Sequence, residues 1–75
     1  MKISTLGLGG RLQRARKSTG LSQEAVAEKI GVSWITIHRW ERSQRMVPDV
    51  LLDRLCELYD KPMHWFLTLE DGDVD

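Results

Sequence analysis

The sequence predicts an all-α fold, a compact bundle of five helices, and three observations support this prediction. Apolar residues recur every three or four positions, the spacing that gathers them on one face of a helix. Serine, glycine and proline residues divide the chain into segments of helix length. No segment alternates between apolar and polar residues, as a half-buried strand would. The 75 residues are expected to form a single domain, with an ordered core at about 8–69 and an acidic tail at 70–75.

The first two helices are expected from about Leu8 to Ser18 and from Gln23 to Lys29 or Ile30. Gly20 and Gly31 follow them, since glycine takes the left-handed backbone of a helix C-terminus without steric cost. Ser22 is a good N-cap for the second helix, because its hydroxyl can accept a hydrogen bond from a first-turn amide. The residues expected to be buried on these helices are Leu8, Leu12, Ala15, Val26, Ala27 and Ile30.

The third helix is expected from Trp34 to about Arg42, with Ser33 as its N-cap. Ile37 and Trp40 lie three residues apart and form its inward face, while Thr36 is partly covered. The opposite face of this helix is therefore free to meet a partner.

A loop at 43–47 separates the third helix from the last two. The fourth helix begins at Pro48 or Asp49, and Asp60-Lys61-Pro62 breaks the chain after it. The fifth helix is expected from Met63 to Leu67 or Leu69. The residues that should be buried on these two helices are Leu52, Leu55, Cys56, Tyr59, Met63, Phe66 and Leu67.

The charges are unevenly distributed, although the formal net charge is zero. Residues 1–45 hold nine basic and three acidic side chains, a formal charge of +6, and residues 46–75 hold two basic and eight acidic ones, a charge of −6. A partner responds to the local field, so the basic half favours a polyanion such as nucleic acid. The alternative is an ordinary solvated surface whose charges happen to segregate.

Several classes of protein are disfavoured by the composition. A single cysteine excludes an intrachain disulfide, and the spacing of Cys56, His38 and His64 fits no zinc site. No catalytic constellation, cofactor motif or metal site is apparent, so we expect neither an enzyme nor a cofactor. No segment approaches the roughly 20 apolar residues of a membrane span, and the N-terminus is too short for a signal peptide. A soluble, cytoplasmic protein is expected.

The stretch from Gln23 to Trp40 forms one unit, with two short helices joined by a tight turn. Helices that cross steeply need a small residue at their closest approach, and Ala27 meets that need. Gly31 supplies the sharp turn between them. This arrangement is a helix-turn-helix, in which the second helix projects one face into the major groove of DNA.

The sequence also resembles a known family over about 8–67. The segment that carries the resemblance is LGGRLQRARKSTGLSQEAVAEKIGVSWITIHRWERSQR, and its specific core is LSQEAVAEKIGVS. It is similar to the Cro/phage-repressor-type helix-turn-helix family, which has the lambda-repressor-like fold. The resemblance implies a sequence-specific regulator of transcription, a repressor, that binds double-stranded DNA as a homodimer.

The resemblance also implies roles for individual residues. Arg39 is the best direct reader, because its guanidinium can bond O6 and N7 of guanine together. Arg16 and Glu41 match a structural ion pair between the first and third helices. The residues implied to read base edges are Trp34, Ile35, His38 and Arg39. The residues implied to contact phosphates are Gln23, Ser33, Thr36, Arg42, Gln44 and Arg45.

Trp34 and Ile35 depart from the family, because polar readers are common at these positions. They could pack on thymine methyls or sugars, but neither can form a bidentate hydrogen bond to a base. The alternative is that one of them turns inward or meets a partner protein. A second hypothesis therefore stays open, a protein-interaction module such as an antitoxin-like or adaptor domain. Ser43 also replaces a usual glycine, which leaves the loop geometry uncertain.

Trp65 is expected on a side of the fifth helix away from the core. An exposed tryptophan suggests an interface, so Trp65 with Val47 or Leu69 could form a two-fold dimer contact. The alternative is partial burial of Trp65 against the domain's own tail. The sequence also leaves open a further C-terminal regulatory domain or a partner protein beyond this chain.

Overall fold

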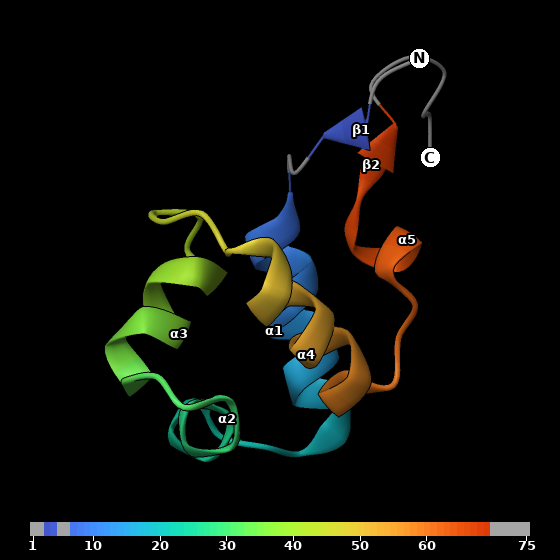
Figure 1. The fold of residues 1–75 in the computed structure, drawn as a ribbon. Coiled ribbons are helices and arrows are strands. Elements are labelled where there is room, and N and C mark those ends of the chain that lie inside the picture. Colours follow the sequence, from blue (N-terminus) through green and yellow to red (C-terminus); the bar gives the residue numbers. More distant parts are fainter. Residues whose placement is uncertain (1–2, 5–6, 70–75) are drawn as a thin grey trace.

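A computed structural model of the protein describes residues 3–4 and 7–69, and the side chains of residues 7–67. Its helices and strands, in chain order, are β1 (Ile3–Ser4), α1 (Leu8–Thr19), α2 (Gln23–Ile30), α3 (Trp34–Glu41), α4 (Asp49–Tyr59), α5 (Met63–Phe66) and β2 (Thr68–Leu69) (Figure 1). The predicted all-α bundle of five helices is confirmed.

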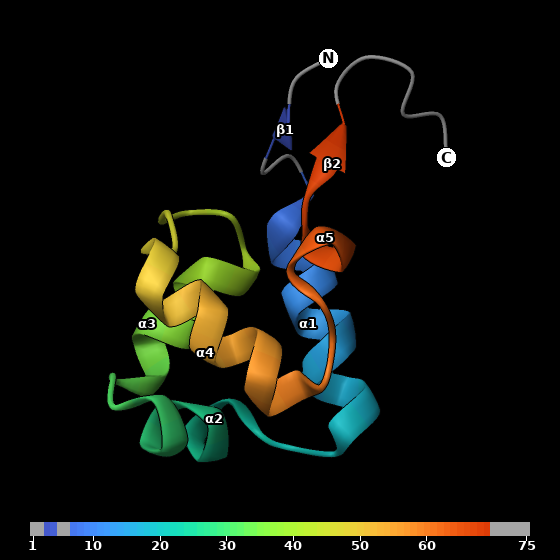
Figure 2. The same ribbon diagram turned by 45° about the vertical axis from the view of Figure 1, so that its right-hand side comes forward.

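The helices form a small globule in which α1 and α4 lie between α3 and α5 (Figures 1 and 2). Helix α1 contacts α3, α4 and α5, and α2 contacts α3 and α4. Leu12, Ile37, Leu55 and Phe66 come from four different helices and are all buried in one core. Burial of apolar side chains from every helix is what holds so short a chain together.

The helix ends follow the predicted caps. The Ser22 hydroxyl accepts a hydrogen bond from the Ala25 amide at 3.0 Å. Gly20 and Gly31 have φ angles of 78° and 90°, the left-handed backbone that glycine adopts freely. Ser33 occupies the N-cap position of α3, but its hydroxyl lies 3.0 Å from the Thr36 hydroxyl and does not cap the helix.

The predictions for the chain ends are wrong in two respects. Helix α5 ends at Phe66, because Leu67 already has extended backbone with φ −103° and ψ 152°. The following residues form β2, which pairs antiparallel with β1, so that Ile3 lies opposite Leu69 and Ser4 opposite Thr68. Strands of two residues show no periodicity in the sequence, and this pair depends on contact between opposite ends of the chain. The Leu69 side chain and the tail at 70–75 lie outside the described part.

Cys56 has the structural role expected from the sequence. Its thiol is buried on α4, and Sγ lies 3.9 Å from Sδ of Met63 on α5. Burial raises the pKa of the Cys56 thiol, and the nearby Asp53 carboxylate raises it further. Among the described helices, none is long and apolar enough to cross a membrane.

Candidate nucleic-acid interface

The two faces of α3 differ sharply in burial. Ile37 and Trp40 are 2% and 3% exposed, so the inner face is fixed in the core. On the outer face Trp34 is 49% exposed and Ile35 is 41% exposed, and Arg39 is exposed beside them. The alternative that one of the apolar pair turns inward is therefore excluded, and contact with a partner protein stays open. Helix α3 is held from behind and offers its outer face to a partner.

An ion pair between α1 and α3 fixes the orientation of α3. Nε and Nη2 of Arg16 donate to the two carboxylate oxygens of Glu41 at 2.7 and 3.1 Å. Nη1 of Arg16 also donates to the Leu21 carbonyl at 3.0 Å, which ties the turn before α2 to the same guanidinium. The hydrogen bond to Glu41 raises the pKa of Arg16, which keeps the guanidinium charged. This is the pair that the family resemblance implies.

The side chain of Gln23 also belongs to this network. Its Nε2 donates to Oε1 of Glu41 at 3.0 Å and lies 3.5 Å from Nδ1 of His38. Gln23 is thus at the start of α2, as predicted, but its amide is directed toward α3. Sequence reasoning missed this bond, because it joins residues 18 positions apart. No local pattern reports a contact of that separation.

His38 lies between Gln23 and Trp34. The rings of Trp34 and His38 meet edge to face, with centroids 5.9 Å apart and an interplanar angle of 62°. His38 is half-buried, whereas the other three residues expected to read bases are exposed. The structure therefore brings all four of them to one side of α3, with His38 behind Trp34.

The loop after α3 carries further exposed polar and basic side chains, those of Arg42, Gln44 and Arg45. Ser43 has a φ of 58°, so it takes the left-handed backbone that a glycine would adopt more easily. This geometry lets the backbone N–H of Gln44 donate to the backbone carbonyl of Arg39 at 2.9 Å. The uncertain loop is thus a tight turn that places Arg42 and Arg45 directly beyond α3.

Gly9 permits the close approach of α1 to the end of α3. A β-carbon at Gly9 would lie 2.6 Å from the Glu41 carbonyl oxygen and 2.8 Å from that of Trp40. Both atoms belong to the backbone, so they cannot move aside easily. Gly9 carried no signal in the sequence that would separate it from Gly10, because the difference between them is the backbone of α3 packed against Gly9 alone.

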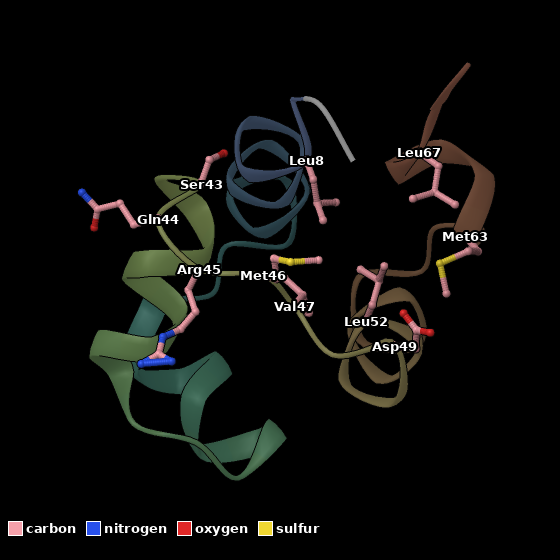
Figure 3. Close-up of a pocket in the computed structure, with 10 residues that line it drawn as sticks. All are labelled: Leu8, Ser43, Gln44, Arg45, Met46, Val47, Asp49, Leu52, Met63 and Leu67. Carbon is pink, nitrogen blue, oxygen red and sulfur yellow. The ribbon is translucent and has the colours of Figure 1, made fainter. Parts of the chain in front are cut away.

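A groove of about 610 Å³ opens beside this loop, between α1, α4 and α5 (Figure 3). The side chains of Met46, Val47 and Leu52 lie along it, whereas those of Gln44 and Arg45 point away (Figure 3). Met46 is 83% exposed. The apolar side chains of the loop therefore face the groove, whereas Gln44 and Arg45 line it too but extend outward from it (Figure 3).

Trp65 is half-buried and packs on its own domain. Its ring meets the Phe66 ring edge to face at 5.0 Å, and Nζ of Lys61 lies 4.9 Å from its centroid. Of the two residues expected to pair with it, Val47 lines the groove and Leu69 has no described side chain. The structure therefore corrects the expectation of an exposed Trp65.

A comparison with known protein families identifies the type of domain. The family described as helix-turn-helix domain matches residues 7–62. The chain belongs to this family. The matched range contains the two helices α2 and α3, the turn at Gly31 and the ion pair that braces them.

Individual relatives of this helix-turn-helix domain agree with that assignment. A protein of Pyrococcus furiosus, assigned as an HTH-type transcriptional regulatory protein, is 36% identical over 55 residues. These residues are 73% of this chain but only 18% of that relative. The chain thus spans less than a fifth of the length of the curated relative that it matches.

Two solved structures show the same fold. The restriction-modification controller protein C.AhdI from Aeromonas hydrophila matches with a TM-score of 0.75 and 31% identity, over 83% of this chain and 94% of that one. The DNA-binding domain of BldD matches with a TM-score of 0.71 and 29% identity, over 84% of this chain and 92% of that one. The resemblance to Cro/repressor-type helix-turn-helix proteins is therefore confirmed.

Proposed function

We propose that this protein is a sequence-specific regulator of transcription, of the repressor type, that binds double-stranded DNA. The observation that carries the proposal is the outer face of α3, where Arg39 lies beside Trp34 and Ile35 and is followed by Arg42 and Arg45, all exposed. Exposed guanidinium groups around a helix of this motif match the phosphates on both sides of a major groove. The printed names of two relatives, a transcriptional regulatory protein and a DNA-binding domain, support the same function.

Arg39 reads the bases in this proposal, because its guanidinium is exposed at the centre of the outer face and can form two hydrogen bonds to guanine. Phosphates are contacted by side chains at the two ends of α3. The hydroxyls of Ser33 and Thr36 lie at its start. Arg42, Gln44 and Arg45 follow its end. Gln23 contributes by holding α3, since its side-chain amide donates a hydrogen bond to Glu41. Gln23 is also the first residue of α2, and a helix N-terminus favours a bound anion such as a phosphate.

The regulator acts as a homodimer on DNA in this proposal. Met46 and Val50 are 83% and 73% exposed and lie at the loop and the first turn of α4, next to the groove that Val47 lines. Two copies in contact through this face would bury apolar surface that a lone domain leaves in water. A two-fold dimer should recognise an inverted repeat whose half-sites lie one helical turn apart, about 34 Å.

Selection of binding sites from random duplex DNA with the 75-residue chain tests this function. We expect enrichment of an inverted repeat with half-sites about one turn apart. Enrichment of a single half-site would keep the sequence-specific function and contradict the homodimer. No enrichment by the folded protein would contradict the function as a regulator. It would favour the second candidate, a protein-interaction module, for which the exposed Trp34 and Ile35 are the specific observation.

A further inference from the structure

Two large apolar side chains stand at the start of the helix proposed to enter the groove. Among the described side chains, four large hydrophobic ones are exposed, and two of these, Trp34 and Ile35, are neighbours in the first turn of α3. Of the other two, Met46 lines the groove between α1, α4 and α5, and Val50 lies in the first turn of α4. The apolar pair is thus a separate feature of the α3 face.

Trp34 is held in place from behind. The Trp34 and His38 rings meet edge to face, with their centroids 5.9 Å apart. Nδ1 of His38 lies 3.5 Å from Nε2 of Gln23, which donates a hydrogen bond to the buried carboxylate of Glu41. A ring fixed in this way loses little side-chain entropy when a ligand contacts it. Ile35 is β-branched, so its rotamers are also restricted. The pair therefore offers a preformed apolar surface.

The positive charges on the same face indicate which kind of ligand this apolar surface binds. Arg39 lies one turn beyond Ile35, and Arg42 and Arg45 follow. A cationic rim around an apolar pair fits a polyanion that displays small apolar groups between its charges. In the major groove of DNA the apolar group is the methyl on C5 of thymine, since the remaining base-edge positions there are mainly hydrogen-bond donors and acceptors.

Such a surface discriminates between bases because it cannot form all the hydrogen bonds that some base edges require. Ile35 has no hydrogen-bond donor and Trp34 has only its indole N–H, so the pair cannot satisfy both the O6 and the N7 acceptors of guanine, and covering them would leave a buried polar atom without a partner. A pyrimidine methyl has no such requirement and gains from leaving water. Cytosine carries the same group only when C5 is methylated, because 5-methylcytosine presents its methyl at the position that thymine uses.

We propose that Trp34 and Ile35 together recognise pyrimidine C5-methyl groups in the major groove. The preferred site then contains thymine at the positions under the first turn of α3, and 5-methylcytosine replaces thymine there better than cytosine does. This inference rests on the proposed DNA-binding function and names the chemical group that part of the interface selects.

Thymine-to-uracil exchange tests the proposal, because uracil lacks only the methyl group. The probe is a fluorescent duplex of the sequence recovered by selection, with each thymine replaced by deoxyuridine in turn. Binding of the full 75-residue chain is followed by anisotropy. Loss of one buried methyl should weaken binding about fourfold at one or two positions per half-site. Cytosine placed at the same positions should bind more tightly once its C5 is methylated.

Protein variants assign the effect to the two side chains. Trp34→Ala and Ile35→Ala should bind the thymine and uracil duplexes with nearly equal affinity, and circular dichroism should show both to be folded, because each side chain is largely exposed. His64→Ala removes an exposed ring from α5, outside the proposed DNA and dimer contacts, and should keep the full thymine preference.

Three results would overturn the proposal. If the wild-type protein binds its selected duplex but no position distinguishes thymine from uracil, the methyl-reading role is wrong while the DNA-binding function stands. If the methyl effect persists in both α3 variants, other residues cause it. If the folded protein binds no duplex at all, the proposed function itself fails, and the inference fails with it.

Discussion

At the scale of the residue, Glu41 joins three helices through one buried carboxylate, which accepts hydrogen bonds from Arg16 of α1 and Gln23 of α2. Its side chain is only 2% exposed. We expect Glu41→Gln to lower the free energy of unfolding by about 3 kcal/mol, because it leaves the Arg16 guanidinium without its counter-charge. Urea unfolding followed by circular dichroism measures the loss.

Gln23→Ala is the matched control, since it removes a hydrogen bond to the same carboxylate and leaves the ion pair. It should cost about 1–2 kcal/mol. Equal losses for the two variants would mean that the ion pair contributes no more than the single hydrogen bond from Gln23.

Gly9 and Gly10 are neighbours in α1 with opposite surroundings. A β-carbon at Gly9 would meet backbone atoms of α3, whereas one at Gly10 has no neighbouring atom within 4 Å. Gly9→Ala should therefore lower the free energy of unfolding by about 1–3 kcal/mol through overpacking. Gly10→Ala should raise it by about 0.5–1 kcal/mol through helix propensity. Thermal unfolding of the pair checks both signs, and stabilisation by Gly9→Ala would show that α1 and α3 are less closely packed.

Tyr59 is the only tyrosine of the chain, so its ionisation can be followed alone by ultraviolet absorbance. Burial raises the pKa of Tyr59 above its ordinary value of 10.0, and the Glu41 carboxylate adds to the shift. In the unfolded chain the phenol loses its proton near pH 10, while the folded form retains it. The stability that the raised pKa of Tyr59 contributes is therefore complete below that pH and is lost as the pH rises above it. Phenolate formation near pH 10 in a protein whose circular dichroism is unchanged would contradict the burial of Tyr59.

At the scale of the element, the sequence was sufficient for the first four helices and insufficient beyond them. The bounds of α1 to α4 agree with prediction to within about one residue, because caps such as Ser22 and Gly31 and the apolar spacing are local signals. The β1–β2 pair and the end of α5 depend on contacts between distant parts of the chain. The same reason explains the candidate site: the outer face of α3 was predictable, but the bond from Gln23 to Glu41 was not.

The phosphate contact proposed for Arg42, just after α3, can be tested separately from the base contact proposed for Arg39. Arg42→Ala should weaken binding to all duplexes alike and reduce the dependence of log K on log salt concentration by about one unit, because one phosphate contact is lost. Anisotropy titrations at several salt concentrations, on the selected duplex and an unrelated one, measure this. A loss confined to the selected duplex would assign Arg42 to the bases instead.

Arg39→Ala should behave differently, since Arg39 is proposed to bond guanine directly. We expect a loss of about 1–3 kcal/mol on the selected duplex and a relaxed base preference at one position. Repeating the site selection with this variant measures the preference. An unchanged affinity and an unchanged selected sequence would show that the reading face lies elsewhere.

At the scale of the whole molecule, the helix proposed to read DNA and the C-terminal helix lie on opposite sides. In both views α3 is separated from α5 by α1 and α4 (Figures 1 and 2). Along the chain the formal charge is +6 in residues 1–45 and −6 in residues 46–75, and the exposed Arg39, Arg42 and Arg45 lie in α3 or just after it. A polyanion should therefore approach the side of α3 and be repelled from the acidic part. We therefore expect the domain to bind DNA in one orientation, with α3 toward the duplex.

Amide chemical-shift mapping tests this orientation most directly, because a chain of 75 residues gives a resolved nuclear magnetic resonance spectrum. The isotopically labelled protein is titrated with its selected duplex, and an equal amount of an unrelated duplex serves as the control. We expect the largest shifts at 33–45, in α3 and the loop after it, with smaller ones at the start of α2 and little change at 63–66 in α5. Shifts concentrated in α4 and α5, with α3 unaffected, would contradict the central claim that α3 reads the DNA.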